Sequence, residues 1–488
     1  MTISTEIEAP FVGTEIDGSG AQSDSPDKPK AAVCIGFRKS TGTVLEAVPF
    51  LVTSDEVADL AADRRPMLAD MLRSFRRANP YTELWGIAIN EPSGGTAGTQ
   101  TITPVGTATA AGTIIFRVGG YRISVDVAVG DDPTAIAASI AAAFQLADNA
   151  GLPGTTAAAS GVATFTNSHK GAYEVKITVG GYPGETLPAG VSAVNIAAGA
   201  TAAGVMTITT ATDVLGSRPY DRVVLGMHSD TILDSVEATL AARWAANVEL
   251  DGIAVCAHIG ASLSTINTYT ASPARNSQYS VVVAGPDTAF QAPAWRVAAI
   301  VAGLDLSEAL CNTPRSGLIL PGIDPGTGTQ FDLAQRSILI KAGASTLRVD
   351  ASGNVVIDRL VTTYQKNGAG AVDKLFQNVG TMAAIAYLRW LWRNRILLKY
   401  PRHLLGDDGA QAAPAVPLAP PSTMRAAAAA THKEASDLGL LDSSTLAAFL
   451  EALSVARPTG DNNRLNVIMS PVFLAQFLKL ATTLRPQL

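Results

Sequence analysis

The sequence is poor in charged residues. Of its 488 residues, 16% are Asp, Glu, Lys or Arg and 47% are hydrophobic, whereas soluble domains commonly carry about 25% charged residues. So few charges suit a chain whose surface is covered by other copies of itself, although an Ala- and Gly-rich α/β enzyme would have the same composition. The net charge of -6 and the lack of a basic stripe argue against a nucleic-acid binder, because neutralising phosphates requires a basic face.

Cysteines and long apolar runs are also scarce. Cys34, Cys256 and Cys311 lie far apart, which favours reduced buried thiols over a disulfide framework or a metal site. The N-terminus has neither the basic region nor the apolar region of a secretory signal, so we expect a protein made and kept in a cytoplasm. The most apolar predicted helix, at 383–398, contains three arginines, and no run reaches the ~18 uncharged residues of a membrane span.

The length exceeds what one hydrophobic core supports, so several domains are expected. Apolar strand-like runs at 32–36, 222–227, 252–258 and 279–284 alternate with helical segments such as 67–78, 231–247 and 294–304. Such alternation predicts a doubly wound, mostly parallel sheet covered on both faces. We assign this α/β body to 31–95 plus 213–335.

Residues 96–212 interrupt the body and differ from it in composition, since Ala, Gly, Thr and Val dominate there. A two-residue turn, Gly119-Gly120, joins two strand-like runs into a predicted hairpin, and Asp132-Pro133 starts a helix that runs to about residue 147. The segment is predicted to be a small, β-rich α+β domain inserted in the body, with a plain structural role.

The two ends of the chain are predicted to be extended arms, 1–30 with its linker and 481–488. Residues 10–17 alternate like one strand, and a lone strand must add to a sheet of its own or of another subunit; the strand-forming side chains are Phe11, Val12, Thr14 and Ile16. Residues 336–480 form a predicted C-terminal α+β domain. It has a hairpin at 346–357, a helix at 381–400 ended by Pro401, a Pro/Ala linker at 411–421 and a strand at 463–469.

An α/β body makes an enzyme the alternative hypothesis, but the motifs tested are absent. The sequence has no P-loop, no G-x-G-x-x-G and no G-x-S-x-G. His228 and His258 end two predicted strands, where open sheets carry active sites, and Asp230 and Ser262 are near in sequence. A solvated histidine at a strand end is the favoured interpretation. The histidines and cysteines lack metal-binding spacing, so no catalytic, cofactor or metal residue is predicted.

Several blocks of the C-terminal part resemble contractile phage tail sheath proteins, in particular the Mu-like tail sheath family. They are GASTL at 343–347, RLVTTY at 359–364, KYPRH at 399–403 and DDG at 407–409, and their order and spacing carry the resemblance. Residues 9–17 resemble the start of the family with a displaced glycine. The likeness covers the N-terminal arm, the body and most of 336–488, where 336–480 corresponds to the sheath core domain, while the insertion matches mainly in position.

The resemblance implies a structural protein and not an enzyme. Family members polymerise as stacked hexameric rings around a tail tube and contract to drive the tube through the host envelope, as in genome ejection by a virion or in a contractile injection system. The implied partners are other copies of the chain, the tube protein, and baseplate and tail terminator proteins, with no cofactor, nucleic acid or membrane insertion. Assembly would occur in the host bacterial cytoplasm. The alternative is an α/β hydrolase-like enzyme with an inserted domain.

Strand addition by the arms also requires a receiving sheet. We expect it in the hairpin and the late strand, with the residues Leu347, Val349, Val355, Ile357, Leu465 and Val467. The helix at 381–400 carries basic side chains that either form a solvated face or contact the tube or a neighbouring subunit, namely Arg389, Arg393, Arg395 and Lys399.

Overall fold

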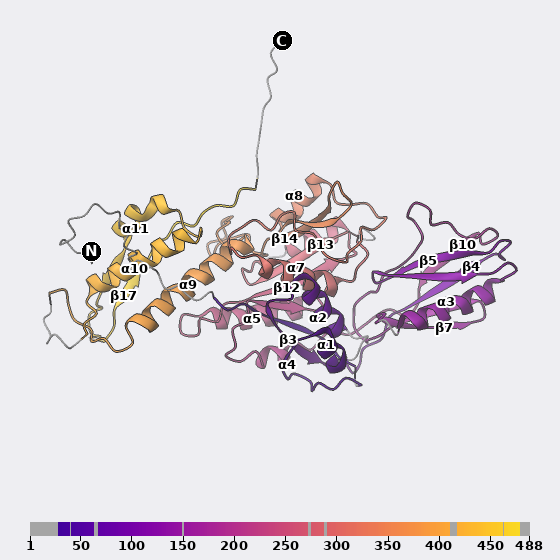
Figure 1. The fold of residues 1–488 in the computed structure, drawn as a ribbon, viewed down its shortest axis with the longest axis horizontal. Coiled ribbons are helices and arrows are strands. Elements are labelled where there is room, and N and C mark those ends of the chain that lie inside the picture. Colours follow the sequence, from indigo (N-terminus) through magenta and orange to yellow (C-terminus); the bar gives the residue numbers. More distant parts are fainter. Residues whose placement is uncertain are drawn as a thin grey trace, which may run out of the picture.

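The molecule is elongated, with three parts in a row (Figure 1). The computed structural model describes residues 28–39, 41–62, 67–148, 151–271, 275–286, 290–409, 417–461 and 463–478. The body lies in the middle, the inserted module at one end and the helices α10 and α11 of the C-terminal part at the other.

An eight-stranded mixed sheet forms the centre of the body, in the order β15-β14-β13-β12-β11-β1-β3-β2. From β3 to β14 neighbouring strands run parallel, and the outermost strands β2 and β15 are antiparallel to their neighbours. The α/β class predicted from the sequence is therefore confirmed as a large mixed sheet accompanied by smaller sheets. The strands are β1 (Ala31–Phe37), β2 (Phe50–Leu51), β3 (Glu83–Ile89), β11 (Arg222–Leu225), β12 (Ile253–Ile259), β13 (Ser280–Gly285), β14 (Ala344–Val349) and β15 (Val355–Arg359).

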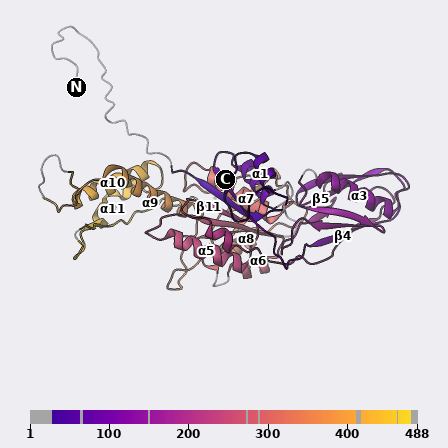
Figure 2. The ribbon, with the colours of Figure 1, turned by 90° about the horizontal axis from the view of Figure 1, so that it is seen from below.

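Helices cover both faces of this sheet (Figure 2). On one side lie α1 (Asp55–Ala62), α2 (Met67–Ala78) and α7 (Ala294–Ser307); on the other lie α5 (Asp230–Trp244), α6 (Leu263–Thr270) and α8 (Leu333–Lys341). The short α4 (Thr209–Asp213) leads back from the insertion. Helices α2 and α7 approach closely at Gly303, where a Cβ atom would lie 3.1 Å from the Phe75 carbonyl oxygen. The strands between these layers are apolar because both of their faces are buried; Cys34 and Cys256 are buried free thiols on β1 and β12.

The hairpin β14–β15 belongs to the body sheet, which differs from the predicted boundary at residue 336. Strand β14 pairs in parallel with β13, so the hairpin extends the sheet at that side. The Asp350–Asn354 turn expected from the sequence is present, with the Asp350 carboxylate accepting hydrogen bonds from the backbone of Ser352 and Asn354. Alternation revealed the hairpin, but a local pattern does not tell which distant strand lies beside it.

The inserted module consists of two sheets around one helix. The sheets have the orders β10-β4-β8-β7 and β6-β5-β9. Phe144 of α3 (Pro133–Asp148) joins them, because its ring lies 5.3 Å from that of Phe116 and 6.5 Å from that of Phe165, one from each sheet. The predicted hairpin turns at Gly119-Gly120, both with positive φ. The strands are β4 (Thr99–Val105), β5 (Gly112–Val118), β6 (Tyr121–Val127), β7 (Gly154–Ala159), β8 (Val162–Asn167), β9 (Ile177–Val179) and β10 (Ala193–Ala198).

The C-terminal part is joined to the body by one long helix, α9 (Val379–Lys399). Beyond it lie α10 (Pro421–Asp437), the 3-10 helix η3 (Ser443–Thr445), α11 (Leu446–Ala452), and the strands β16 (Ser454–Ala456) and β17 (Asn466–Ile468). Leu391 of α9 is buried with Ala435 of α10 and Leu440. A second small cluster joins Ala428 and Phe449. This end of the molecule thus has its own small apolar clusters.

Candidate inter-subunit surfaces

The predicted arm residues Phe11, Val12, Thr14 and Ile16 lie outside the described residues, as does the predicted arm 481–488. The description starts at Lys28, directly before β1. The structure therefore shows the base of the N-terminal arm, and the arm itself stays a prediction.

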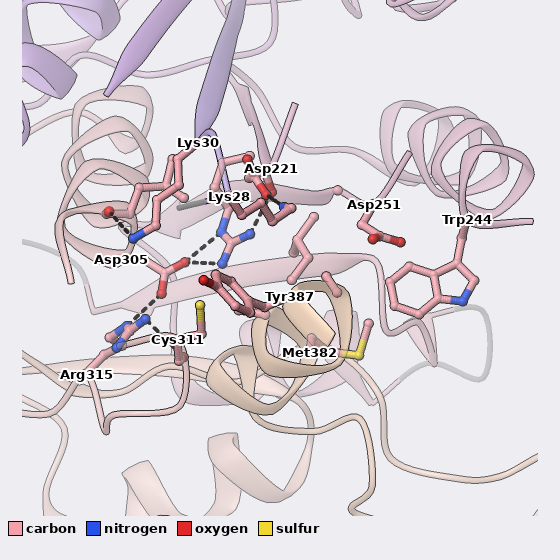
Figure 3. Close-up of a pocket in the computed structure, with 16 residues that line it drawn as sticks. Lys28, Lys30, Asp221, Trp244, Asp251, Asp305, Cys311, Arg315, Met382 and Tyr387 are labelled. Atoms are coloured by element: carbon pink, nitrogen blue, oxygen red, sulfur yellow. Dashed lines mark hydrogen bonds and ion pairs between the residues drawn. The ribbon is translucent and has the colours of Figure 1, made fainter. Parts of the chain in front are cut away.

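The base of the arm is fixed to the body by charged groups (Figure 3). Lys28 forms an ion pair with Asp221, and the other oxygen of the same carboxylate accepts a hydrogen bond from the Ala31 N–H at 3.1 Å. The Lys30 ammonium donates to the carbonyl oxygens of Leu306, at 3.2 Å, and Glu308, at 2.7 Å. These bonds hold the chain where it enters β1, so a pull on the arm would be transmitted directly to the central sheet.

A buried charge network lies beneath this base. The Asp305 carboxylate, on α7, accepts from Arg222 Nε at 2.6 Å and from Arg315 Nε at 2.8 Å. The exposed fractions of these residues are 2% for Asp305, 4% for Arg222 and 5% for Arg315. Burial alone would raise the pKa of Asp305, but the two guanidinium groups outweigh it and the pKa is lowered. A carboxylate shared by two arginines ties β11, α7 and the loop after α7 together.

A cavity of about 40 Å³ separates this network from α9. Lys28, Asp221 and Asp251 line it from the body, and Met382 and Tyr387 line it from α9 (Figure 3). Such a volume holds a few water molecules at most, which is too little for a cofactor. Residues 28–30, the body sheet and the helix that leads to the C-terminal part meet at this cavity.

The late strand of the prediction is found in a two-stranded ribbon. Strand β17 pairs antiparallel with β16, with Val467 opposite Val455. Among the described residues, neither strand has a further strand partner. Leu465 and Val467 are half-buried, while Ile468 is 61% exposed. An isolated pair of strands is marginally stable in water, so an added strand would stabilise the ribbon, and its receiving role stays a prediction.

The hairpin part of the receiving-sheet prediction is contradicted. Strand β14, with Leu347 and Val349, lies between β13 and β15. The outer edge of β15 is covered by the segment 317–320: Gly317 N–H donates to the Ile357 oxygen at 2.8 Å, and Leu320 N–H donates to the Val355 oxygen at 2.8 Å. Val355 and Ile357 are 1% exposed. The apolar alternation indicated burial correctly, but it carried no information about the segment that covers the edge.

The basic side chains of α9 mostly bind partners within the chain. Arg389 donates to Asp251 at 2.7 Å and to the Trp244 oxygen at 2.6 Å, and its guanidinium carbon lies 4.9 Å from the centre of the Trp244 ring. The remaining members of the set differ in exposure: Arg393, 52% exposed, lies 3.4 Å from Glu249; Arg395 pairs with Glu434; Lys399 is exposed.

These contacts hold α9 against the loop that follows α5. These acidic partners were not identified from the sequence. Glu249 and Asp251 lie just after a predicted helix, and Arg389 and Arg393 are four residues apart on one face of another. Contact with a tube or a neighbour remains a prediction for the exposed Arg393 and Lys399.

The strand-end histidines are half-buried and lie against each other. The rings of His228 and His258 lie 4.1 Å apart, and the Tyr269 ring lies edge-on to both. Burial first and His258 second lower the pKa of His228 to about 3, so both rings are neutral at pH 7. They line a cavity of about 260 Å³ between the body and the inserted module, with Glu174, Lys176 and Trp295 opposite.

The Asp230 carboxylate and the Ser262 hydroxyl, which acyl transfer would need, contact other groups and not the histidines. The Asp230 carboxylate lies 3.3 Å from Arg275, and the Ser262 hydroxyl accepts from the Thr265 N–H at the start of α6. At the carboxyl end of β1, where enzymes of this topology bind ligands, the inserted module itself fills the space: His169 Nε2 accepts from the Met67 N–H at 3.1 Å. Asp230, Ser262 and the two strand-end histidines are therefore not arranged as a catalytic triad.

Two further observations concern only the residues that the structure describes. None of their helices is long and apolar enough to cross a membrane. No group of three or more His, Cys, Asp or Glu side chains among them is placed to hold a metal ion.

Comparison with known proteins gives a consistent family. Residues 198–363 match the family model described as phage tail sheath protein central domain. The Mu-like prophage FluMu tail sheath protein of Haemophilus influenzae is 26% identical over 480 residues, which covers 97% of this chain and 96% of that protein.

Two solved structures are similar over most of the chain at low identity. The sheath tail protein of Desulfitobacterium hafniense is 12% identical with a TM-score of 0.46, and the match covers 95% of this chain and 100% of that one. The sheath tail protein of Listeria innocua is 11% identical with a TM-score of 0.46, over 91% of this chain and 96% of that one. The family model over the central part and the relative that matches almost the whole chain show that this chain is similar to phage tail sheath proteins, a family of structural proteins and not of enzymes.

Proposed function

We propose that this chain is the subunit of a contractile sheath that polymerises as stacked rings of six around a tail tube. Contraction of the sheath drives the tube through the host envelope. The free energy comes from the assembly itself, because a metastable extended lattice passes to one that buries more subunit surface. The similarity to phage tail sheath proteins supports this function, and the structure adds a candidate for the link between subunits.

The observation that carries the link is the ribbon β16–β17, whose strands have only each other as strand partners within the described residues. We propose that the arm at 11–16 of one subunit adds a strand to this ribbon of a neighbour. Backbone hydrogen bonds would then hold the connection while larger faces exchange partners during contraction. The exposed apolar side chain of Ile468, on β17, would be covered in the same step.

The remaining partners follow from the same proposal. The exposed basic positions of α9, Arg393 and Lys399, would face the tube protein or the next subunit. Baseplate and tail terminator proteins would bind the two ends of the sheath. Assembly takes place in the cytoplasm of the host bacterium, before the virion is released.

Deletion of residues 1–18 tests the link. The truncated chain should give folded monomers by circular dichroism but no connected sheath by electron microscopy. As a matched control, Glu15→Gln in the full chain should leave assembly unchanged, whereas Val12→Asp with Ile16→Asp should reproduce the deletion, since both apolar side chains lie on one face of the predicted strand. A truncated protein that still builds a sheath contracting as a connected whole would show that the arm does not make the link.

A further inference from the structure

The sheet edges of this molecule differ in how they are protected. Edge strands expose unpaired N–H and C=O groups, and proteins guard them with charge, shortness or a covering segment. Strand β2 has two residues, β15 is covered by 317–320, and β6 carries Arg122 and Asp126 at exposed positions. Strand β10 lies near β9. Val179 of β9 and Val194 of β10 line a cavity of about 190 Å³.

Strand β7 is less protected: Gln145 of α3 donates to the Thr156 oxygen at 3.5 Å, but β7 is neither short nor charged. It is the last strand of its sheet and pairs only with β8. It is six residues long, and Thr155, Ala157, Ala158 and Ala159 are exposed. The sequence has no Asp, Glu, Lys or Arg between Asp148 and Lys170. An uncharged, exposed edge of this length is a template for another strand.

The whole sheet that β7 borders shares this character. Strands β4, β7, β8 and β10 contain no charged residue, and their single aromatic residue, Phe165, is buried on the inner face. On the outer face, Thr155 lies opposite Thr166, and Ala157 lies opposite Thr164.

This composition restricts the partner. Nucleic acid and anionic lipid require basic groups, and single strands and many other planar ligands use aromatic platforms. Neither is present on this face. An uncharged protein strand fits this face. Its backbone would form hydrogen bonds with the unpaired N–H and C=O groups of the edge, and its side chains would bring no charge that lacks a partner.

We propose that β7 docks a second copy of this chain, engaged through the charge-free side of its own inserted module. That side consists of β10 and the residues after it. Residues 186–212 contain no charged residue, and 198–201 are exposed. Contact between two different surfaces of the same module repeats from copy to copy, as a polymer requires. The inference rests on the proposed function, because it assumes that copies meet in an assembly.

The position of the module gives this contact a separate role from the arms. The module lies at the end of the molecule opposite α10, α11 and the ribbon (Figure 1). Contacts at the two ends therefore reach different parts of a neighbour. The β7 contact would brace subunits at the end of the molecule that the ribbon does not reach.

Cross-linking of the assembled full-length protein tests the contact. The double variant Ala157→Cys with Ala197→Cys, treated with a short bis-maleimide, should give a ladder of covalent oligomers in polymer and only monomer before assembly. The matched control Ser124→Cys with Ala197→Cys, in which the exposed Ser124 lies on β6, should give no ladder. The native protein supplies the background from Cys34, Cys256 and Cys311.

Charge on the edge supplies a second measurement. Thr155→Lys with Ala157→Lys should leave the melting temperature of the monomer unchanged and raise the concentration needed for assembly by about tenfold, because a lysine at a closed edge is unpaired. Ser124→Lys is the control.

Polymers of normal length that give no ladder, or an unchanged assembly concentration for the lysine pair, would overturn the β7 contact and leave the sheath function intact. A native chain that forms no polymer would overturn both.

Discussion

Removal of the Asp305 carboxylate should open the core of the body, because Asp305 is the shared partner of two buried arginines. In Asp305→Ala, Arg222 and Arg315 lose bonds of 2.6 and 2.8 Å and remain in a site where each is at most 5% exposed. Breaking a buried ion pair costs about 3–5 kcal/mol. Arg222 still donates to the Asp221 oxygen, and Arg315 still donates to the Thr313 oxygen at 2.9 Å, so we expect the lower end, about 3 kcal/mol.

Asp305→Asn separates charge from shape. The amide keeps the volume and one acceptor oxygen, so the expected loss is about 2 kcal/mol, near that of a hydrogen bond to a charged group. The control is Asp407→Ala, because Asp407 pairs with Arg457 at 2.8 Å but its side chain is 75% exposed. Exposed pairs contribute below about 1 kcal/mol.

Hydrogen exchange of the backbone amides of α7 and β11 is the suitable assay, because it reports local opening in a chain of several parts. A loss of 3 kcal/mol corresponds to a protection lower by about two orders of magnitude. The pKa of Asp305 is lowered in the folded chain, so its contribution is present above the ordinary carboxyl pKa and is lost as the pH falls through the folded value. Protection reduced by less than about fivefold in Asp305→Ala, or equal effects for Asp305→Ala and Asp407→Ala, would refute this account.

Two further predictions concern α9 and the strand-end histidines. Arg389→Ala should destabilise the docking of α9 by about 2–3 kcal/mol, because the Asp251 carboxylate, 8% exposed, loses its guanidinium partner. The control Arg393→Ala should change the docking free energy by less than about 0.5 kcal/mol. Hydrogen exchange of the α9 amides compares the two variants, and equal effects would contradict the docking role of Arg389. The melting temperature should fall as the pH drops from about 6.5 toward the lowered pKa of His228 near 3, because the unfolded histidine takes up the proton first. His228→Gln should flatten this slope, and a variant with the unchanged slope would contradict the assignment.

The sequence predicted the parts of the fold that local patterns specify. The apolar runs near 32–36 and 252–258 became β1 and β12. The Gly119-Gly120 turn joined β5 and β6, since both residues adopt positive φ that glycine tolerates. Asp132 precedes α3 and Pro133 is its first residue, as helix-start chemistry predicts.

The missed features depend on contacts between residues far apart in the chain. Residues 317–320 cover β15 without any strand pattern of their own, and this contact removed the hairpin from the candidate receiving sheet. The Asp305 network was also missed. Its signal was the single acid of the mostly apolar helix 294–307, together with Arg222 at the start of an apolar strand, and a charge in such a place must find a buried partner.

The residues of the candidate surfaces differ in where the structure places them. Val467 lies in a ribbon that has no other strand partner within the described residues, whereas Arg389 is engaged inside its own chain. A sequence shows which side chains carry charge, but whether the partner is in the same chain or in another copy depends on the folded geometry.

The long helix between the body and the C-terminal part acts as a lever. Its 21 residues span about 30 Å at the rise of an α-helix. Arg389, halfway along, holds it to the body, and Ala384 and Leu391 belong to the apolar cluster that includes Ala435 of α10. If α9 stays rigid, turning the body by one degree about the near end of this rod would displace the far end by about 0.5 Å, so a rotation of several degrees at the central sheet would move the ribbon by several ångströms.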